Sequence, residues 1–119
     1  MGVTGIGGFS FRAKDPQALA AWYAEHLGVG GGDYGLWDQA AGRTLFSPFD
    51  AGTDSFPADK QWMLNFRVEG LDELKAALAA KGIEVITDPG WDAPGVGRFA
   101  RIFDPEGNQI ELWEEWESD

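Results

Sequence analysis

Apolar and polar residues alternate along two segments of the chain, which predicts two half-buried strands. In residues 7–13, GGFSFRA, Phe9 and Phe11 fall on one face while Ser10 and Arg12 fall on the other. Residues 62–68, WMLNFRV, repeat the same two-residue period. Successive side chains of a strand point to opposite faces, so each segment has one face for a core and one that can carry polar groups.

Each of these segments is followed by apolar residues at a helical spacing. Asp15 and Pro16 are favoured at the start of a helix, and the apolar side that follows consists of Leu19, Trp22, Tyr23 and Leu27. Gly28 is a typical C-terminal stop. A second amphipathic helix is expected over about residues 71–81, with Gly82 as its stop. Both strands are therefore predicted to lead into a helix.

Further short strands are expected in both halves of the chain. Residues 34–38, 43–49 and 82–89 have short apolar runs bounded by glycine or proline, whereas residues 50–60, DAGTDSFPADK, are polar and turn-rich and predict a connection. The run Asp-Pro-Glu-Gly-Asn at residues 104–108 separates two alternating segments. It predicts a β-hairpin near the end of the chain.

The order strand, helix, three strands thus occurs twice. FSFRAKDPQALAAWYAEHLGV in the first half aligns with LNFRVEGLDELKAALAAKGIEV in the second, with one residue deleted in the first. An internal duplication explains this, and a chance match of two short units is the alternative. We expect an α+β fold in one domain, residues 1–119, with one module over about 1–49, a connection over 50–60 and a second module over about 61–119.

Composition and charge exclude several classes of partner. A chain of 119 residues can bury one core, and its formal net charge of −11 opposes broad contact with nucleic acid or anionic lipid. No apolar run approaches the roughly 20 residues that cross a bilayer, and MGVTGIGGFSF has no basic start, so a cytoplasmic location is expected. The absence of cysteine excludes disulfides and thiolate chemistry.

The two modules, the opening FRAKDPQALAAWYAEHLGV and the ending DPEGNQIELWE resemble the vicinal oxygen chelate superfamily, which includes glyoxalase I, extradiol dioxygenases and bleomycin-resistance proteins. This resemblance covers nearly the whole chain. It implies two tandem βαβββ modules that form a cupped, partly open mixed β-barrel, with helices outside and a small-molecule site inside. It also implies a homodimer, because many members of the superfamily dimerise.

Metal enzymes of this superfamily take ligands from the first and last strand of each module. The resemblance carries those positions to Gly8, Phe46, Met63 and Glu111. Only Glu111 suits a hard or borderline cation, since the thioether of methionine is soft and the other two side chains offer no donor. The only histidine, His26, is expected on an outer helix. We therefore expect no metal and no other cofactor.

Glu111 lies between apolar residues of the hairpin's second strand, so it must face something polar. If the hairpin turn pairs Phe103 with Gln109, Arg101 falls opposite Glu111. The same alternation turns several further polar residues and one tryptophan toward the cup, namely Ser10, Arg12, Asn65, Arg67 and Trp113. These side chains could form internal ion pairs, or they could bind a ligand with an anionic or strongly polar group.

Three functions remain open at this point. The chain could bind a small organic molecule without metal, it could be a metal-independent lyase or isomerase with Glu111 as acid or base, or it could be a catalytically degenerate dimeric paralogue with a structural role. Whether it is an enzyme is left open. The sequence also leaves open whether Trp37, Trp62 and Trp91 line the pocket or a dimer interface.

Overall fold

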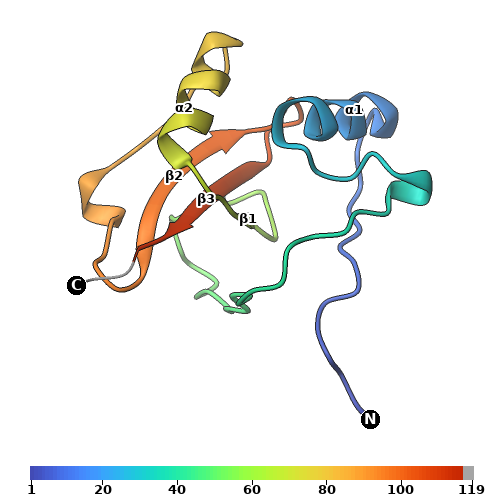
Figure 1. Cartoon of the computed structure of the whole chain (residues 1–119), viewed down its shortest axis with the longest axis horizontal. Helices are drawn as coiled ribbons and strands as arrows, with labels where there is room; N and C mark the ends of the chain where they lie inside the picture. Colours follow the sequence, from blue (N-terminus) through green and yellow to red (C-terminus); the bar gives the residue numbers. More distant parts are fainter. Residues whose placement is uncertain (117–119) are drawn as a thin grey trace.

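The computed structural model describes residues 1–116, and within them two α-helices and one three-stranded sheet (Figure 1). The elements in chain order are α1 (Pro16–Leu27), the 3₁₀ turn η1 (Asp33–Gly35), β1 (Leu64–Arg67), α2 (Leu71–Ala80), the 3₁₀ turn η2 (Pro89–Trp91), β2 (Gly97–Phe103) and β3 (Gln109–Glu115). The predicted helices and the predicted hairpin are confirmed. The fold is α+β, with a mixed sheet.

The sheet has the order β1-β3-β2, so the last strand lies in the middle. β3 runs parallel to β1 and antiparallel to β2. The hairpin register pairs Phe103 with Gln109 and Arg101 with Glu111, as the alternation predicted. In the parallel pair, Asn65 lies beside Glu111. Residues from all three strands are therefore brought to the same row of the sheet.

One face of the sheet carries the core. Ala100 and Ile102 of β2 and Ile110 and Leu112 of β3 are fully buried, and they join Leu19, Tyr23, Leu71 and Leu78 from the two helices. Full burial of a leucine or isoleucine side chain contributes about 1.5–3 kcal/mol. The opposite face, which the helices do not cover, carries Arg101, Glu111 and their neighbours. We call this opposite face of the three strands the cup face.

Local signals explain where the helices begin and end. The Asp15 side chain accepts a hydrogen bond from the Ala18 amide at 3.1 Å, and Gly28 closes α1 in the left-handed conformation. α2 has no cap from its own N-cap glycine, and instead Glu114 of β3 accepts from the Leu71 amide at 2.9 Å. Neither helix in residues 1–116 is both long and apolar enough to cross a membrane.

The Asp104–Asn108 turn attaches α1 to the sheet. The buried carboxylate of Asp104 accepts from the hydroxyl of Tyr23 at 2.7 Å, from the Asn108 side chain at 2.8 Å and from two backbone amides of the turn. Glu106 accepts from the amides of Lys14 and Asp15, just before α1. Burial and the neighbouring Asp104 carboxylate raise the pKa of Tyr23 far above its ordinary value. The turn is thus a structural joint.

The first half of the chain differs from its prediction. Residues 1–49 include α1 and η1, but none of the strands predicted at 7–13, 34–38 and 43–49. In Figure 1 the first residues extend away from the sheet. The described residues form neither a second sheet from the first half of the chain nor a closed barrel. Alternation indicates which face can be buried, but a strand also needs a neighbouring backbone. Residues 37–49 make no backbone–backbone hydrogen bond within the described chain.

The strand predicted at residues 82–89 is reduced to one bridge. Ile86 and Arg101 exchange both backbone hydrogen bonds at 2.8 Å, so residue 86 lies along the outer edge of β2. The chain then turns at Asp88, whose side chain accepts from the Gly90 amide. This early turn ends the pairing after a single residue, and it brings Trp91 back toward the sheet.

Candidate functional site

The centre of the cup face is an ion pair between β2 and β3. Arg101 Nε lies 3.2 Å from Glu111 Oε2, and the side chains of Arg101 and Glu111 are only 18% and 12% exposed. Asn65 of β1 donates its side-chain amide to Glu111 Oε1 at 2.9 Å. Each carboxylate oxygen of Glu111 therefore has a protein donor. The predicted pairing of Arg101 with Glu111 is confirmed, and Asn65 belongs to the same cluster.

Arg101 is held from three directions. Besides Glu111, its Nη1 group donates to the main-chain carbonyl of Ser55 at 3.1 Å, and its guanidinium lies 4.1 Å from the centre of the Trp91 ring. Its Nη2 group donates to none of residues 1–116. A side chain fixed in this way keeps donors for an additional acceptor in the plane of the guanidinium.

Gln109 also belongs to the cluster, although it is not among the site residues predicted from the sequence. Its side-chain amide donates to the Ser55 carbonyl at 2.9 Å and contacts Met63 Sδ at 3.0 Å. Gln109 lies two residues before Glu111 on the same strand, so the alternation that selected Glu111 could also have selected Gln109. The Ser55 carbonyl had no such signal, because it lies in the irregular connection.

Three other predicted residues lie apart from the Arg101–Glu111 contacts. Arg67 donates to the carbonyl of Ala40 at 2.8 Å. Ser10 and Arg12 are exposed, and neither donates to Glu111 in the described structure. The prediction that these two side chains point into the cup requires residues 7–13 to be a paired strand, and the structure does not pair that segment. Their roles in ligand binding stay predictions.

The tryptophans take different positions. Trp113 is buried, donates its indole N–H to the Val96 carbonyl at 3.0 Å and stacks on Phe99 at 6.4 Å. Trp62 packs edge-on against Phe9 and Phe11. Trp37 contacts the edge of Phe66 and is 41% exposed, so part of its surface is open. Among these three and Trp91, only Trp91 contacts the guanidinium of Arg101.

The residues at the family's four metal positions do not fit a metal. Gly8 has no donor, Phe46 is 87% exposed and apolar, and the Met63 sulfur already contacts Gln109. Glu111 is engaged through both oxygens. Within residues 1–116 no three histidine, cysteine, aspartate or glutamate side chains are grouped to hold a metal ion. One carboxylate falls short of the set of about three or four donors that a divalent site uses.

A wide hollow of about 2450 Å³ runs along the outer edge of β1. Asn65 and Arg67 line it from the sheet, and segments of the first half of the chain line its other side. Arg101 and Glu111 do not line it. The Ser55 carbonyl of the connection accepts from Arg101 and Gln109 on the cup face, and its neighbours Thr53 and Phe56 line the hollow.

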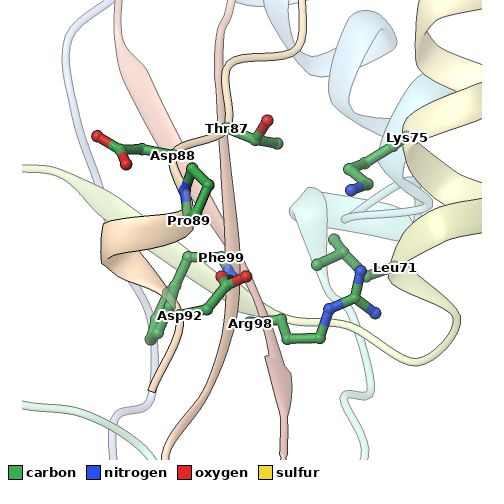
Figure 2. A pocket seen from close by; sticks show the side chains of 8 residues that line it. All are labelled: Leu71, Lys75, Thr87, Asp88, Pro89, Asp92, Arg98 and Phe99. Carbon is green, nitrogen blue, oxygen red and sulfur yellow. Dashed lines mark hydrogen bonds between the residues drawn. The ribbon is translucent and has the colours of Figure 1, made fainter. Parts of the chain in front are cut away.

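A smaller pocket of about 140 Å³ lies between α2, η2 and β2 (Figure 2). Two basic residues line it: Arg98 is paired with Asp72 at 2.6 Å and with Glu114 at 3.3 Å, and Lys75 lies 3.3 Å from Asp72. The hydrogen bond from Arg98 holds the pKa of Asp72 below its ordinary value. The two basic side chains are thus paired within the protein, the Asp88 and Asp92 carboxylates accept from backbone amides, and the pocket is small for an organic ligand.

These features define a class of protein: an α+β domain with a mixed sheet, whose one face packs on helices while the other presents an arginine, a glutamate and two amides. The family model described as "Glyoxalase-like domain" matches residues 8–113, so the chain belongs to the glyoxalase-like domain family. That assignment covers both halves of the chain. It agrees with the superfamily resemblance noted from the sequence.

Two kinds of relative are similar to this chain. The protein called "Putative glyoxylase CFP32" in Mycobacterium bovis, and its namesake in Mycobacterium tuberculosis, are each 46% identical over 46 residues, or 39% of this chain. The aligned segment spans only 17% of the length of those relatives. The crystal structure of TnmS3, an antibiotic binding protein from Streptomyces sp. CB03234, superposes over 97% of this chain and 98% of its own with a TM-score of 0.61 at 23% identity. That similarity shows a shared fold.

Proposed function

We propose that the chain binds a small organic molecule on the cup face, without a metal, through Arg101 and its partners. The observation that carries the proposal is the state of Arg101: Glu111 and Trp91 fix its guanidinium, while its Nη2 group has no acceptor in residues 1–116. A fixed guanidinium with spare donors suits an anionic or strongly polar group of a ligand. The family assignment and the antibiotic-binding relative support the same class of function.

Glu111 serves in this proposal to position Arg101. Both of its oxygens accept hydrogen bonds, from Asn65 and Arg101, so its observed contacts are those of a residue that orients Arg101, while each oxygen keeps one further lone pair. Catalysis by Glu111 as acid or base therefore ranks second. A third possibility, a degenerate dimeric paralogue with a structural role, predicts no ligand at all.

We further propose that residues 1–119 act as one domain, with modules over about 1–49 and 61–119 that together bound the ligand. The match of one family model to residues 8–113 supports this, because it spans both segments. Arg67, Ser10, Arg12 and Trp113 keep their proposed roles as further ligand-binding residues. Location in the cytoplasm stays a prediction.

The test is a ligand screen by NMR with wild-type protein, Glu111→Gln and the matched control Glu84→Gln. Glu84 is exposed and makes none of the cup-face contacts, so its variant controls for the lost charge. We expect Glu111→Gln to keep the fold and to weaken binding of hits by about tenfold, since Arg101 loses its charged partner. Glu84→Gln should bind within about twofold of wild type.

Two results would contradict the proposal. If no compound of a broad library binds the cup face of the wild type, the degenerate paralogue is favoured. If a hit is turned over, and Glu111→Gln abolishes turnover while it binds the hit as tightly as wild type, the enzyme with Glu111 as acid or base is favoured.

A further inference from the structure

Two side chains from neighbouring strands converge on a single oxygen atom. Arg101 Nη1 of β2 and Gln109 Nε2 of β3 lie 3.1 and 2.9 Å from the main-chain oxygen of Ser55. Gln109 is buried and Arg101 is largely covered, so both donors are held in place by their surroundings. A charged and a neutral donor aimed at one point form a binding position for an oxygen with negative charge.

The segment that supplies this oxygen is weakly attached. Residues 53–57, which we call the strap, contain no helix or strand. Apart from the bonds to the Ser55 carbonyl, their hydrogen bonds are local: the Ser55 amide donates to Thr53 Oγ1 at 3.1 Å, the Thr53 amide to Asp50, and the Lys60 amide to Pro57. Phe56 adds a ring contact with Phe49, which is itself 48% exposed. The strap is therefore joined to the cup face mainly through the Ser55 carbonyl.

We propose that Arg101 and Gln109 form a carboxylate-binding subsite, and that the Ser55 carbonyl holds the position of a ligand oxygen until a ligand displaces the strap. This inference rests on the proposed function and names its ligand class, small organic carboxylates. One carboxylate oxygen takes the place of the Ser55 carbonyl. The second accepts from Nη2 of Arg101, which gives the parallel two-bond geometry that guanidinium favours.

Charge and geometry both favour a carboxylate over the strap. A carboxylate brings a negative charge to the guanidinium and can accept two parallel bonds from it, whereas the neutral Ser55 carbonyl accepts one bond from Arg101. Trp91 covers the guanidinium face, which leaves its edge as the direction of approach. Glu111, 3.2 Å from Arg101 Nε, already offsets the charge of the guanidinium, so the preference rests on the two-bond geometry and the second donor from Gln109; the more distant acidic residues are screened beyond about 10 Å in ordinary salt. A flat carboxylate that enters along the cup face meets these requirements.

The experiment uses benzoate as the probe and benzamide as its uncharged counterpart, each titrated into ¹⁵N-labelled protein. Benzoate should shift the side-chain amide of Gln109 and the backbone amides of the strap, and benzamide should bind at least about tenfold more weakly. Gln109→Met removes the amide donor at similar size and should weaken benzoate binding by about tenfold. Gln17→Met, on the exposed side of α1, should leave it within about twofold.

The outcomes separate this inference from the proposed function. The subsite would be overturned if a folded Gln109→Met variant bound benzoate as tightly as the wild type does. It would also be overturned if the chemical-shift changes caused by benzoate were confined to Arg98 and its neighbours. Absence of benzoate binding would also overturn it, and the proposed function would survive if an uncharged hit of the ligand screen still bound the cup face. If Gln109→Met unfolds, Gln109→Leu and the benzamide comparison in wild type decide the matter.

Discussion

Replacing Tyr23 by phenylalanine tests whether the Asp104 turn joins α1 to the sheet. The Tyr23 hydroxyl is buried and donates to Asp104 at 2.7 Å, and Asp104 keeps a second side-chain donor, Asn108 at 2.8 Å. Losing a hydrogen bond to a charged acceptor costs about 1.5–3 kcal/mol. Because Asn108 remains, we expect Tyr23→Phe to lower the free energy of unfolding by about 1.5 kcal/mol, which corresponds to a decrease in Tm of about 6 °C for a domain of this size.

The pH dependence gives a sharper signature. The pKa of Tyr23 in the folded protein is raised above its unfolded value of about 10. The contribution of Tyr23 to the free energy of unfolding is therefore complete below pH 10 and is lost as pH rises toward the folded pKa. At pH 11 the unfolded chain has released this proton while the folded protein holds it. Between pH 8 and pH 11 the free energy of unfolding of the wild type should therefore fall by about 1.4 kcal/mol through this residue. Tyr23→Phe should not show this loss.

The assay is urea unfolding followed by tryptophan fluorescence at pH 8, 10 and 11. The stability gap between wild type and Tyr23→Phe should shrink from about 1.5 kcal/mol at pH 8 to near zero at pH 11. Tyr34→Phe is the matched control, because Tyr34 is fully exposed and should change neither value. If the free energies of unfolding of wild type and Tyr23→Phe changed in parallel with pH, the proposed role of the Tyr23–Asp104 hydrogen bond would be refuted.

Two further predictions concern metal content and assembly. Elemental analysis of protein purified without a metal-affinity step should find less than about one tenth of a divalent ion per chain, since Glu111 is the only hard donor at the family positions; near-stoichiometric zinc, nickel, iron or manganese would contradict this. Light scattering at micromolar concentration should find a homodimer, because β1 has no strand on its outer edge within the described chain and Ile6, Leu45 and Phe46 are more than half exposed. A monomer would count against it.

The parts of the fold that sequence predicted are those fixed by local chemistry. Asp15 and Gly28 set the ends of α1 through bonds within a few residues. The Asp104–Asn108 turn set the hairpin register, and with it the pairing of Arg101 with Glu111. Each of these depends on neighbours close in the chain, where residue preference and geometry are directly linked.

The parts that failed depend on distant partners. The alternation in residues 7–13 is real, and Phe9 and Phe11 do share a contact with Trp62, but no backbone lies alongside to make a strand. The covering of the ion pair was also unpredictable. We expected Arg101 and Glu111 to face a partly open cup, whereas the Ser55 carbonyl of the polar connection accepts a hydrogen bond from Arg101. Nothing in the composition of that connection indicates the contact.

The arrangement of β3 separates stability from recognition along a single strand. Ile110 and Leu112 enter the core, while Gln109 and Glu111 face the cup, and the buried Asp104 holds both sets in register. Because the two sets point to opposite faces, exchanging Gln109 or Glu111 for a residue of similar size should change the donors offered to a ligand more than it changes the core. A one-residue slip would instead move both sets to the wrong face at once. The turn that fixes the register is therefore as necessary to the binding surface as the side chains that form it.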